Sequence, residues 1–537
     1  MANTDLLLGP ILGYEWDGAA QQPFYTVIVR ATRGAAPVWV VDGQSVPMQE
    51  LRTLHDGTSV WRGEVALRPC DDGQDAGRSI GYAIRRGQKE LANACGDSQW
   101  SFHLPGKLTS SRQPRIAFCS CNGFTDPKAM DGRDPLHLWR RMEKLHAKEP
   151  FSLLIMGGDQ LYCDDLARKE GTFAQLWAWL GPKDKAQAKP TAAQFLEGYF
   201  DHYLLGWVRT VHEGQAYPHT AMVRMLASVP SVMMWDDHDI FDGWGSYQVD
   251  EKKTPYYREA FDAAREAFEV YQIRGPGHNR SLLDRKVARP RHYSLGMRFG
   301  PYRILALDNR SNRTVRQIMD DTQWGQVTRW LEDEVAALPE GRNTLLVVSP
   351  IPVVYRRFHD WVSALPGEHA GEDDLRDHWS HKNHQGERNR LVFHLFKALR
   401  FDPAGTDYAG QRGSAGFDRV TLLSGDVHVG ALGFLERTDT RAEIAQVVSS
   451  AIIHPEPGPA AWAGLQAISS DDDHSIQGQS VVAKMAPPVG TSPGEGKYLR
   501  CRNFVWLKQG NDDKLWVNWE CEDLKKERPA RTEFGLR

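Results

Sequence analysis

Three short segments of the sequence bring together aspartate and histidine, side chains that bind metals and transfer protons. They are residues 157–162, 235–239 and 424–428, and each directly follows an apolar, β-prone run, at 151–156, 231–234 and 420–423. Buried strands of layered α/β domains are continuous apolar runs, and ligands bind beyond the carboxyl ends of such strands. We therefore expect all three segments to lie at one rim of one sheet.

The chemistry that these side chains favour is metal-dependent hydrolysis, since carboxylate oxygen and imidazole nitrogen suit divalent or trivalent metals. Two metals about 3.5–4 Å apart neutralise phosphoryl charge and generate hydroxide at moderate pH. Asp159 is the natural bridge between two metals, because it follows a buried strand. Asp426 and His428 are two apart in a segment predicted to be extended, so both point the same way and reach one metal each. Asp237 is a further ligand candidate, and the adjacent His238 is placed to protonate the leaving group.

The composition of the chain limits the kinds of binding partner and the cellular location that we expect. The chain has 537 residues, enough for two or more domains, and a net charge of −4. Without a basic excess, nucleic-acid binding is disfavoured. Residues 1–10 lack the basic region of a signal peptide, and no run approaches the ~20 apolar residues of a membrane span. We expect a cytoplasmic protein whose seven cysteines are reduced, buried thiols.

The pattern of elements predicts an N-terminal all-β sandwich followed by an α/β region. Short alternating strands fill residues 1–107, residues 108–114 read as a linker, and strand–helix alternation then begins. We expect a catalytic domain over 115–500, and a C-terminal hairpin and tail over 501–537 that pack on it.

Individual elements can also be placed. Apolar stripes predict helices over 255–272, which Thr254 can cap, and over 322–338, with a further helix over 135–147. Residues 366–388 and 455–497, rich in Gly, Pro, Asp and His, are predicted to be long loops.

Five motifs, taken together, resemble those of one known family. Residues 120–122, 158–162, 236–239, 307–313 and 424–428 resemble, in the same order, the motifs of the PhoD-like alkaline phosphatase family of binuclear metallophosphatases. Residues 9–14 are similar to the start of that family's N-terminal β-domain. Two departures are mild, because Asn122 stands where the family often has Gln and Asp239 where it often has Glu. The twin-arginine signal of secreted members is missing, which puts extracellular phosphate scavenging in doubt.

The resemblance implies a fold, a ligand set and a proton donor. The fold would be a layered αββα metallophosphatase sandwich. The implied metal ligands are Cys121, Asp159, Tyr162, Asp237, Asp426 and His428, with Asp159 as the bridge. A thiolate and a phenolate beside one metal imply iron, and the oxygen-rich second position suits calcium or manganese, with zinc a further option. His238 would be the proton donor, acting next to Asp237.

The expected function is that of a metal-dependent phosphoesterase on a small phosphorylated substrate, in which metal-bound hydroxide attacks phosphorus in line. The alternatives are a phosphodiesterase or phospholipase using the same site, or a non-catalytic binding or scaffold protein that retains a relic metal site.

Several residues have competing interpretations. Arg310 and Arg313 match a basic motif of the family, and either contact phosphate or form a structural ion pair. The histidines spaced by three suggest zinc, but their polar flanks favour a solvated loop; they are His378, His381 and His384. The Gly-x-Ser-x-Gly pattern of serine hydrolases occurs at 77–81 and 490–494, without the strand and helix that a nucleophile elbow needs.

Overall fold

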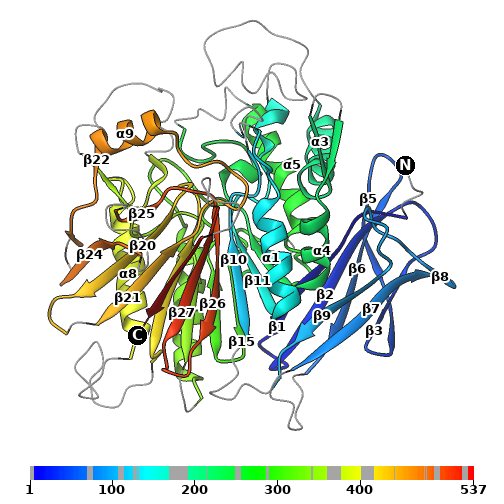
Figure 1. Ribbon diagram of the computed structural model, residues 1–537, viewed down its shortest axis with the longest axis horizontal. Helices are drawn as coiled ribbons and strands as arrows, with labels where there is room; N and C mark the ends of the chain where they lie inside the picture. Colours follow the sequence, from blue (N-terminus) through cyan, green and yellow to red (C-terminus); the bar gives the residue numbers. More distant parts are fainter. Residues whose placement is uncertain are drawn as a thin grey trace, which may run out of the picture. The chain divides into compact units, whose positions relative to one another are not determined.

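The protein has a mixed α/β fold with several sheets (Figure 1). The computed structural model describes residues 5–68, 77–106, 114–124, 130, 132–167, 191–212, 215–247, 255–285, 289–339, 343–359, 376–400, 416–440, 442–476, 478, 480–488, 496–522 and 530–536. Two compact units divide the chain. Unit 1 comprises Met1–Ala117, Asn122–Asp242 and Val249–Arg280, and unit 2 comprises Phe118–Cys121, Gly243–Gln248 and Ser281–Arg537.

Two larger sheets hold most of the described strands of unit 1. The first has the order β11 (Phe151–Gly157), β14 (Ser231–Met234), β1 (Leu6–Asp17), β2 (Gln22–Ala31), β6 (Ser59–Ala66) and β5 (Gln49–Thr53). The second contains β3 (Val38–Val41), β4 (Gln44–Pro47), β7 (Arg78–Arg86), β8 (Lys89–Glu90) and β9 (Gln99–Leu104). β14 runs parallel to both β11 and β1, with Ser231 paired to Leu154 and to Gly13. The described part of residues 1–107 holds only strands, as predicted, and the domain boundaries stay predictions.

Helices cover the sheet strands of unit 1. They are α1 (His137–Lys148), α3 (Ala192–Trp207), α4 (Thr220–Ser228) and α5 (Pro255–Tyr271). α3 packs on α5, α1 packs on α4, and α4 lies against β1 and β9 (Figure 1). The described part of unit 1 also contains the short 3-10 turns η2 (Cys163–Ala167) and η3 (Asp237–Asp239) and the hairpin of β12 (Arg209–His212) and β13 (Gln215–Pro218). The predicted helix 255–272 is confirmed by α5, although its expected cap, Thr254, lies outside the described residues.

The main sheet of unit 2 is built on parallel strands. Its order is β15 (Leu295–Phe299), β16 (Tyr302–Ala306), β17 (Thr344–Val348), β19 (Arg419–Ser424), β21 (Glu443–Val448), β20 (Gly430–Arg437), β24 (Val481–Ala486) and β23 (His474–Ile476), and β25 (Tyr498–Leu499) also pairs with β20. From β16 through β21 the neighbours are parallel, so the chain segments that follow Ala306, Val348 and Ser424 leave at one edge. The predicted C-terminal hairpin is confirmed by β26 (Asn503–Gln509) and β27 (Leu515–Cys521), and β28 (Ala530–Leu536) adds a third antiparallel strand.

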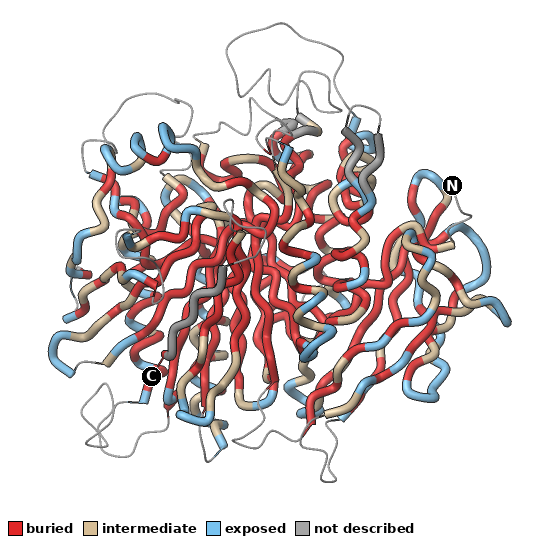
Figure 2. The backbone as a smooth tube through the Cα atoms, viewed as in Figure 1, coloured by how far each residue is buried: buried red, intermediate tan, exposed pale blue. Residues whose placement is uncertain are grey.

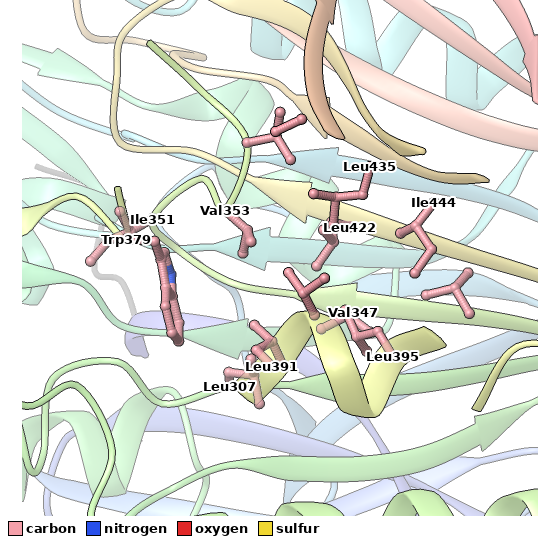
Figure 3. Close-up of a cluster of buried hydrophobic side chains, with 14 of the residues drawn as sticks. Leu307, Val347, Ile351, Val353, Trp379, Leu391, Leu395, Leu422, Leu435 and Ile444 are labelled. Carbon is pink, nitrogen blue, oxygen red and sulfur yellow. The ribbon is translucent and has the colours of Figure 1, made fainter. Parts of the chain in front are cut away.

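The core of unit 2 lies between this sheet and two helices, α6 (Asp321–Ala336) and α8 (Gln385–Ala398). Leu391 and Leu395 of α8 lie beside Val347 of β17, and all three side chains are fully buried (Figure 3). Burial of each such side chain stabilises the fold by about 1.5–3 kcal/mol. α6 confirms the predicted helix 322–338, and the Asp320 side chain caps it by accepting a 2.8 Å hydrogen bond from the Gln323 amide. Figure 2 shows the strands buried over most of their length, with exposure concentrated at turns.

Two predictions about the elements are wrong. Residues 455–497, predicted to be a long loop, contain the helix α9 (Pro459–Ile468), the strand β22 (Ser469–Ser470), which pairs with β18 (Arg357–Phe358), and the strands β23 and β24. Pro459 occupies the first turn of α9, where its fixed φ and missing N–H are tolerated, so proline begins this helix rather than excluding one.

The three chemical segments also do not follow strands of one sheet. β11 and β14 are neighbours in unit 1, whereas β19 belongs to the main sheet of unit 2. The apolar sequence of a buried strand is similar in every sheet that is covered on both faces, so it does not show to which sheet the strand belongs. Which strands pair is decided by contacts between distant residues. Within the described residues, no helix combines the length and the apolar character that crossing a membrane requires.

Candidate metal centre

In unit 1, two predicted ligands lie together at the ends of neighbouring strands. β11 and β14 are parallel, with Gly157 paired to Met234, so the loops that follow them leave the sheet side by side. These loops carry Asp159 and Asp237. Ligand atoms of Asp159, Asp237 and His238 all lie within 4.8 Å of one another. The structure therefore brings these three side chains together, and their role as a site stays a prediction.

A buried carboxylate fastens the two loops to each other. Asp239 accepts hydrogen bonds from the amides of Gln160 (3.1 Å), Leu161 (3.2 Å) and Asp236 (2.9 Å). The side chain of Gln272 donates a further bond of 2.9 Å to it. Burial raises the pKa of Asp239 to about 7, although these donors oppose the rise. Asp239 thus fixes the loop of Asp159 relative to the loop of Asp237.

The acidic cluster fits a multivalent cation. Asp159, Asp236, Asp237 and Asp239 are all at most 5% exposed. Burial raises the pKa of Asp159 well above its ordinary value; His238 opposes the rise and the other three carboxylates add to it. Buried like charges at this spacing are unfavourable, and a bound cation would offset their repulsion. Carboxylate-rich donor sets are those that hard metals prefer.

His238 is held by a carboxylate that the sequence motifs did not indicate. Its Nδ1 lies 2.7 Å from Oδ2 of Asp164, whose other oxygen accepts the Asp242 amide at 2.7 Å. Burial disfavours the charged imidazole, but the charges of Asp164 and Asp237 and the hydrogen bond raise the pKa of His238 well above its usual value. Because Nδ1 faces Asp164, Nε2 is the ring nitrogen on the other side, and it lies 3.9 Å from Oδ1 of Asp242. The only signal in the sequence was the position of Asp164, five residues after Asp159.

Tyr162 also lies at this cluster. Its ring stacks on His238 with 4.2 Å between ring centroids, and its hydroxyl lies 3.5 Å from Oδ2 of Asp159. The neighbouring Gly123 leaves room for the ring, because a Cβ there would come within 2.6 Å of it. The structure therefore brings Tyr162 to the residues with which it was predicted to act, and its ligand role stays a prediction.

In unit 2, a serine links two other predicted ligands. Ligand atoms of Cys121 and His428 lie within 4.8 Å of each other. Ser450 Oγ is 3.0 Å from the Cys121 sulfur and accepts the amide of His428 at 2.9 Å. Cys121 is fully buried, and His428 is half-buried. Asp426 and His428 have φ values of 68° and 54°, so the predicted extended segment is instead a left-handed turn. The rule that side chains two residues apart point the same way holds for an extended strand and does not apply to such a backbone.

Left-handed backbone recurs at the predicted ligands of both units. Cys121 and Asp159 each have φ of 53°, close to the values of Asp426 and His428. Non-glycine residues rarely adopt this region, which persists where the surroundings enforce it and which clusters at functional sites.

Arg310 and Arg313 both engage Asp377. The Arg310 side chain is fully buried and binds the two carboxylate oxygens of Asp377 at 2.8 and 2.5 Å. Nε of Arg313 lies 2.9 Å from Oδ1 of Asp377. Burial opposes ionisation of Asp377, but the two guanidinium groups lower its pKa far below the ordinary value. This arrangement corresponds to the ion-pair interpretation, and contact of either arginine with phosphate stays a prediction.

The polar segment that holds three histidines is not a solvated loop. His378, His381 and His384 are at most 7% exposed, and burial lowers the pKa of His378 to about 4 and of His384 to about 3. Ring packing explains part of this burial, since His378 lies parallel to Tyr355 at 5.7 Å. In the part of the chain that the structure describes, no group of three close donor atoms includes these histidines.

The positions of the Gly-x-Ser-x-Gly serine and of the cysteines can be compared with what the sequence predicted for them. Ser79 of the first Gly-x-Ser-x-Gly match lies exposed within β7, away from any strand–helix turn, and the second match lies outside the described residues. The six described cysteines are free thiols; Cys95 and Cys501 are half-buried rather than buried as predicted.

The fold and these clusters define a mixed α/β protein with metal-binding residue types at strand ends. A family model for PhoD-related phosphatases matches residues 90–370, more than half of the chain, and the chain belongs to this family. An uncharacterized protein of Saccharomyces cerevisiae is 27% identical over 396 residues, which cover 63% of this chain and 52% of the yeast protein. The chain thus spans about half the length of the curated relative it matches.

Two solved structures align with this chain at low identity, and the first of them, PhoD, shares its fold. The structure of PhoD aligns with 100% of this chain and 93% of its own, with a TM-score of 0.55 and 13% identity. Purple acid phosphatase from yellow lupin (Lupinus luteus) seeds aligns with 98% of this chain and 73% of its own, with a TM-score of 0.49 and 12% identity.

Proposed function

We propose that the protein is a metal-dependent phosphoesterase of the alkaline phosphatase D kind, built on a layered αββα sandwich. The observation that carries this proposal is the convergence of Asp159, Asp237 and His238 within 4.8 Å, with His238 held by Asp164. Membership of the PhoD-related phosphatase family supports the choice of phosphate esters over other substrates.

Six residues are proposed as ligands of two metal ions. They are Cys121, Asp159 as the bridge, Tyr162, Asp237, Asp426 and His428. The family resemblance supports this assignment, as do the ligand-atom clusters within each unit. The thiolate and the phenolate favour iron at one position, and the oxygen donors favour calcium or manganese, with zinc an option, at the other. Bound metals there would neutralise phosphoryl charge and lower the pKa of water.

The chain's own residues account for the proton transfer. His238 donates a proton from Nε2 to the oxygen of the leaving group, because Nδ1 is engaged by Asp164. Asp164 fixes the ring plane and stabilises the protonated imidazole, the role of a carboxylate behind a general acid. Asp237 lies next to His238 and contributes negative charge that also favours the protonated imidazole. Arg310 and Arg313 brace the loop after β16 through Asp377.

The substrate class is a small phosphorylated molecule. A phosphodiesterase or phospholipase reaction at the same residues is the second enzymatic possibility. A binding or scaffold protein with a relic site is the non-enzymatic one. A screen of monoesters against diesters with iron, calcium, manganese and zinc separates the enzymatic alternatives.

The decisive experiment combines metal analysis with the variant Asp159→Asn. We expect the purified protein to bind at least about one metal ion per chain and to hydrolyse a phosphate ester, and the variant to lose turnover with its fold intact. Asp284→Asn is the matched control, because Asp284 is buried and accepts the Arg291 amide and the Gln326 side chain elsewhere in unit 2. Substoichiometric metal with no activity after metal addition would refute the enzyme proposal, and near-normal turnover of Asp159→Asn would refute the bridge.

A further inference from the structure

The segment that follows β21 holds the two close ligand candidates of unit 2 in place. The amide of Ile453 donates to the carbonyl of Cys121 at 3.3 Å, and that of His454 donates to the same oxygen at 3.2 Å. On the other side, the amide of Ser449 donates to the carbonyl of Ser424 at 2.9 Å. Residues 449–454 therefore run between the turn that carries Cys121 and the turn that begins after β19.

The same segment is itself anchored from a third direction. Nδ2 of Asn503 donates to the carbonyl of Ser450 at 3.0 Å, and Oδ1 of Asn503 accepts the Ser449 hydroxyl at 2.9 Å. Ser449, Ser450 and Asn503 are fully buried. A segment fastened by buried hydrogen bonds on several sides has little freedom to shift, so the side chain that it presents is pre-organised.

The side chain presented at the end of this segment is His454, and its ring lies on the ring of His428. The centroids are 3.6 Å apart and the planes differ by 18°. Nδ1 of His454 is 2.8 Å from the carbonyl oxygen of Pro455. A carbonyl oxygen accepts only, so Nδ1 is the protonated nitrogen, and this bond fixes the plane of the ring.

We propose that His454 is a positioning residue for His428, acting through the face-to-face contact of the two rings. His428 sits on a left-handed backbone, and its amide is the one that Ser450 binds. The flat face of His454 limits rotation of the His428 imidazole and holds its nitrogens in one direction. This inference rests on the proposed function, since it takes His428 as a metal ligand. Residues that orient a ligand commonly change metal affinity about 10- to 100-fold when they are lost.

Two substitutions separate positioning by the ring face from chemistry of the ring nitrogens. His454→Phe keeps a flat ring over His428 and removes both nitrogens, whereas His454→Ala removes the ring. We expect His454→Ala to bind Co²⁺ about 10- to 100-fold more weakly and to show altered Co²⁺ d–d absorption bands. We expect His454→Phe to restore the affinity to within about threefold and to restore the band positions.

A control histidine distinguishes this effect from general loss of packing. His146 is half-buried, stacks on Phe151 at 6.2 Å, and lies near the start of β11, the end opposite Asp159. His146→Ala should change stability without changing the Co²⁺ spectrum.

Each possible outcome either supports or overturns the positioning role of His454. Wild-type Co²⁺ affinity and bands in His454→Ala would overturn it, as would equal losses in the Phe and Ala variants, which would assign the role to a ring nitrogen. Failure of the wild-type protein to bind Co²⁺ would also overturn it. Co²⁺ binding that follows the expected pattern in a protein without phosphoesterase activity would support the inference while refuting the proposed function.

Discussion

Four predicted ligands, Cys121, Asp159, Asp426 and His428, have positive φ values between 53° and 68°. Each non-glycine residue in such a conformation costs on the order of 1–3 kcal/mol, so the surrounding hydrogen bonds must enforce it. At Asp159 the enforcing group is Asp239, which binds the next two amides. At His428 it is Ser450. Side chains with metal-binding chemistry therefore sit where the fold stores local strain.

His238 and Asp164 give the most direct prediction at the scale of single residues. Asp164→Asn keeps the shape of the side chain and removes the charge that stabilises the protonated imidazole. General acids contribute about 10²- to 10⁴-fold to rate, so we expect kcat for an alkyl phosphate to fall about 10- to 100-fold. An aryl phosphate with a good leaving group needs little protonation and should lose much less.

Steady-state kinetics on the two substrates measure this difference. Equal losses for alkyl and aryl esters would show that Asp164 does not act through a proton donor. His238→Ala should reproduce the same preference and serves as the reference variant.

At the scale of elements, one buried carboxylate connects three separate segments of unit 2. Asp377 accepts the hydroxyl of Ser246 at 2.6 Å and pairs with Arg310 and Arg313, which follow β16. Arg310 Nη1 also donates to the carbonyl of Trp244 at 3.0 Å. This cluster holds together segments that lie outside the named strands.

The pH dependence of unfolding should report this cluster. The pKa of Asp377 is lowered in the folded protein relative to about 3.9 in the unfolded chain. Its contribution is therefore fully present above about pH 4 and is lost as the pH falls through the folded value. Asp377→Asn leaves two buried guanidinium groups without their carboxylate, and we expect it to lower the free energy of unfolding by about 3–5 kcal/mol at pH 7.

Urea unfolding between pH 3 and pH 7 tests this expectation. The difference in the free energy of unfolding between the wild type and Asp377→Asn should become smaller only at the acidic end of this range. Asp42→Asn removes a partly exposed pair with Arg78 and should cost less than about 1 kcal/mol. A constant difference across the whole range would mean that Asp377 does not carry this charge interaction.

At the scale of the whole molecule, we expect the acidic cluster of unit 1 to make the stability of the fold depend on bound metal. Several buried carboxylates at strand ends disfavour the folded state unless a cation is bound. The net charge of −4 also fits a small-molecule enzyme better than a protein that binds the phosphate backbone of nucleic acids.

Metal removal should therefore lower the thermal midpoint. A ligand at 100 times its Kd stabilises by about 2.7 kcal/mol, which corresponds to roughly 2–3 °C in a protein of 537 residues. Calorimetry before and after chelation should show that loss for the wild-type protein, and metal addition should restore it. Asp159→Asn should respond to neither treatment; an equal response would place the stabilising metal elsewhere.

Much of the fold and part of the candidate site followed from local sequence patterns. The stripe of apolar residues over 255–272 predicted α5, and the apolar runs before Asp159 and Asp237 predicted the strands β11 and β14. These predictions succeed because a helical stripe or a buried strand is specified by residues close together in the chain. The loops predicted over 455–497 failed because glycine and proline content does not exclude a helix that begins at proline.

The sequence by itself determined which side chains have metal and proton chemistry and that Asp159 and Asp237 each follow an apolar run. Only the tertiary structure decided their partners. Asp164 meets His238 across 74 residues and Asp377 meets Arg310 across 67, while His454 covers His428. The physical reason is that such contacts depend on which strands pair and how loops pack, and neither leaves a periodic signal in the chain.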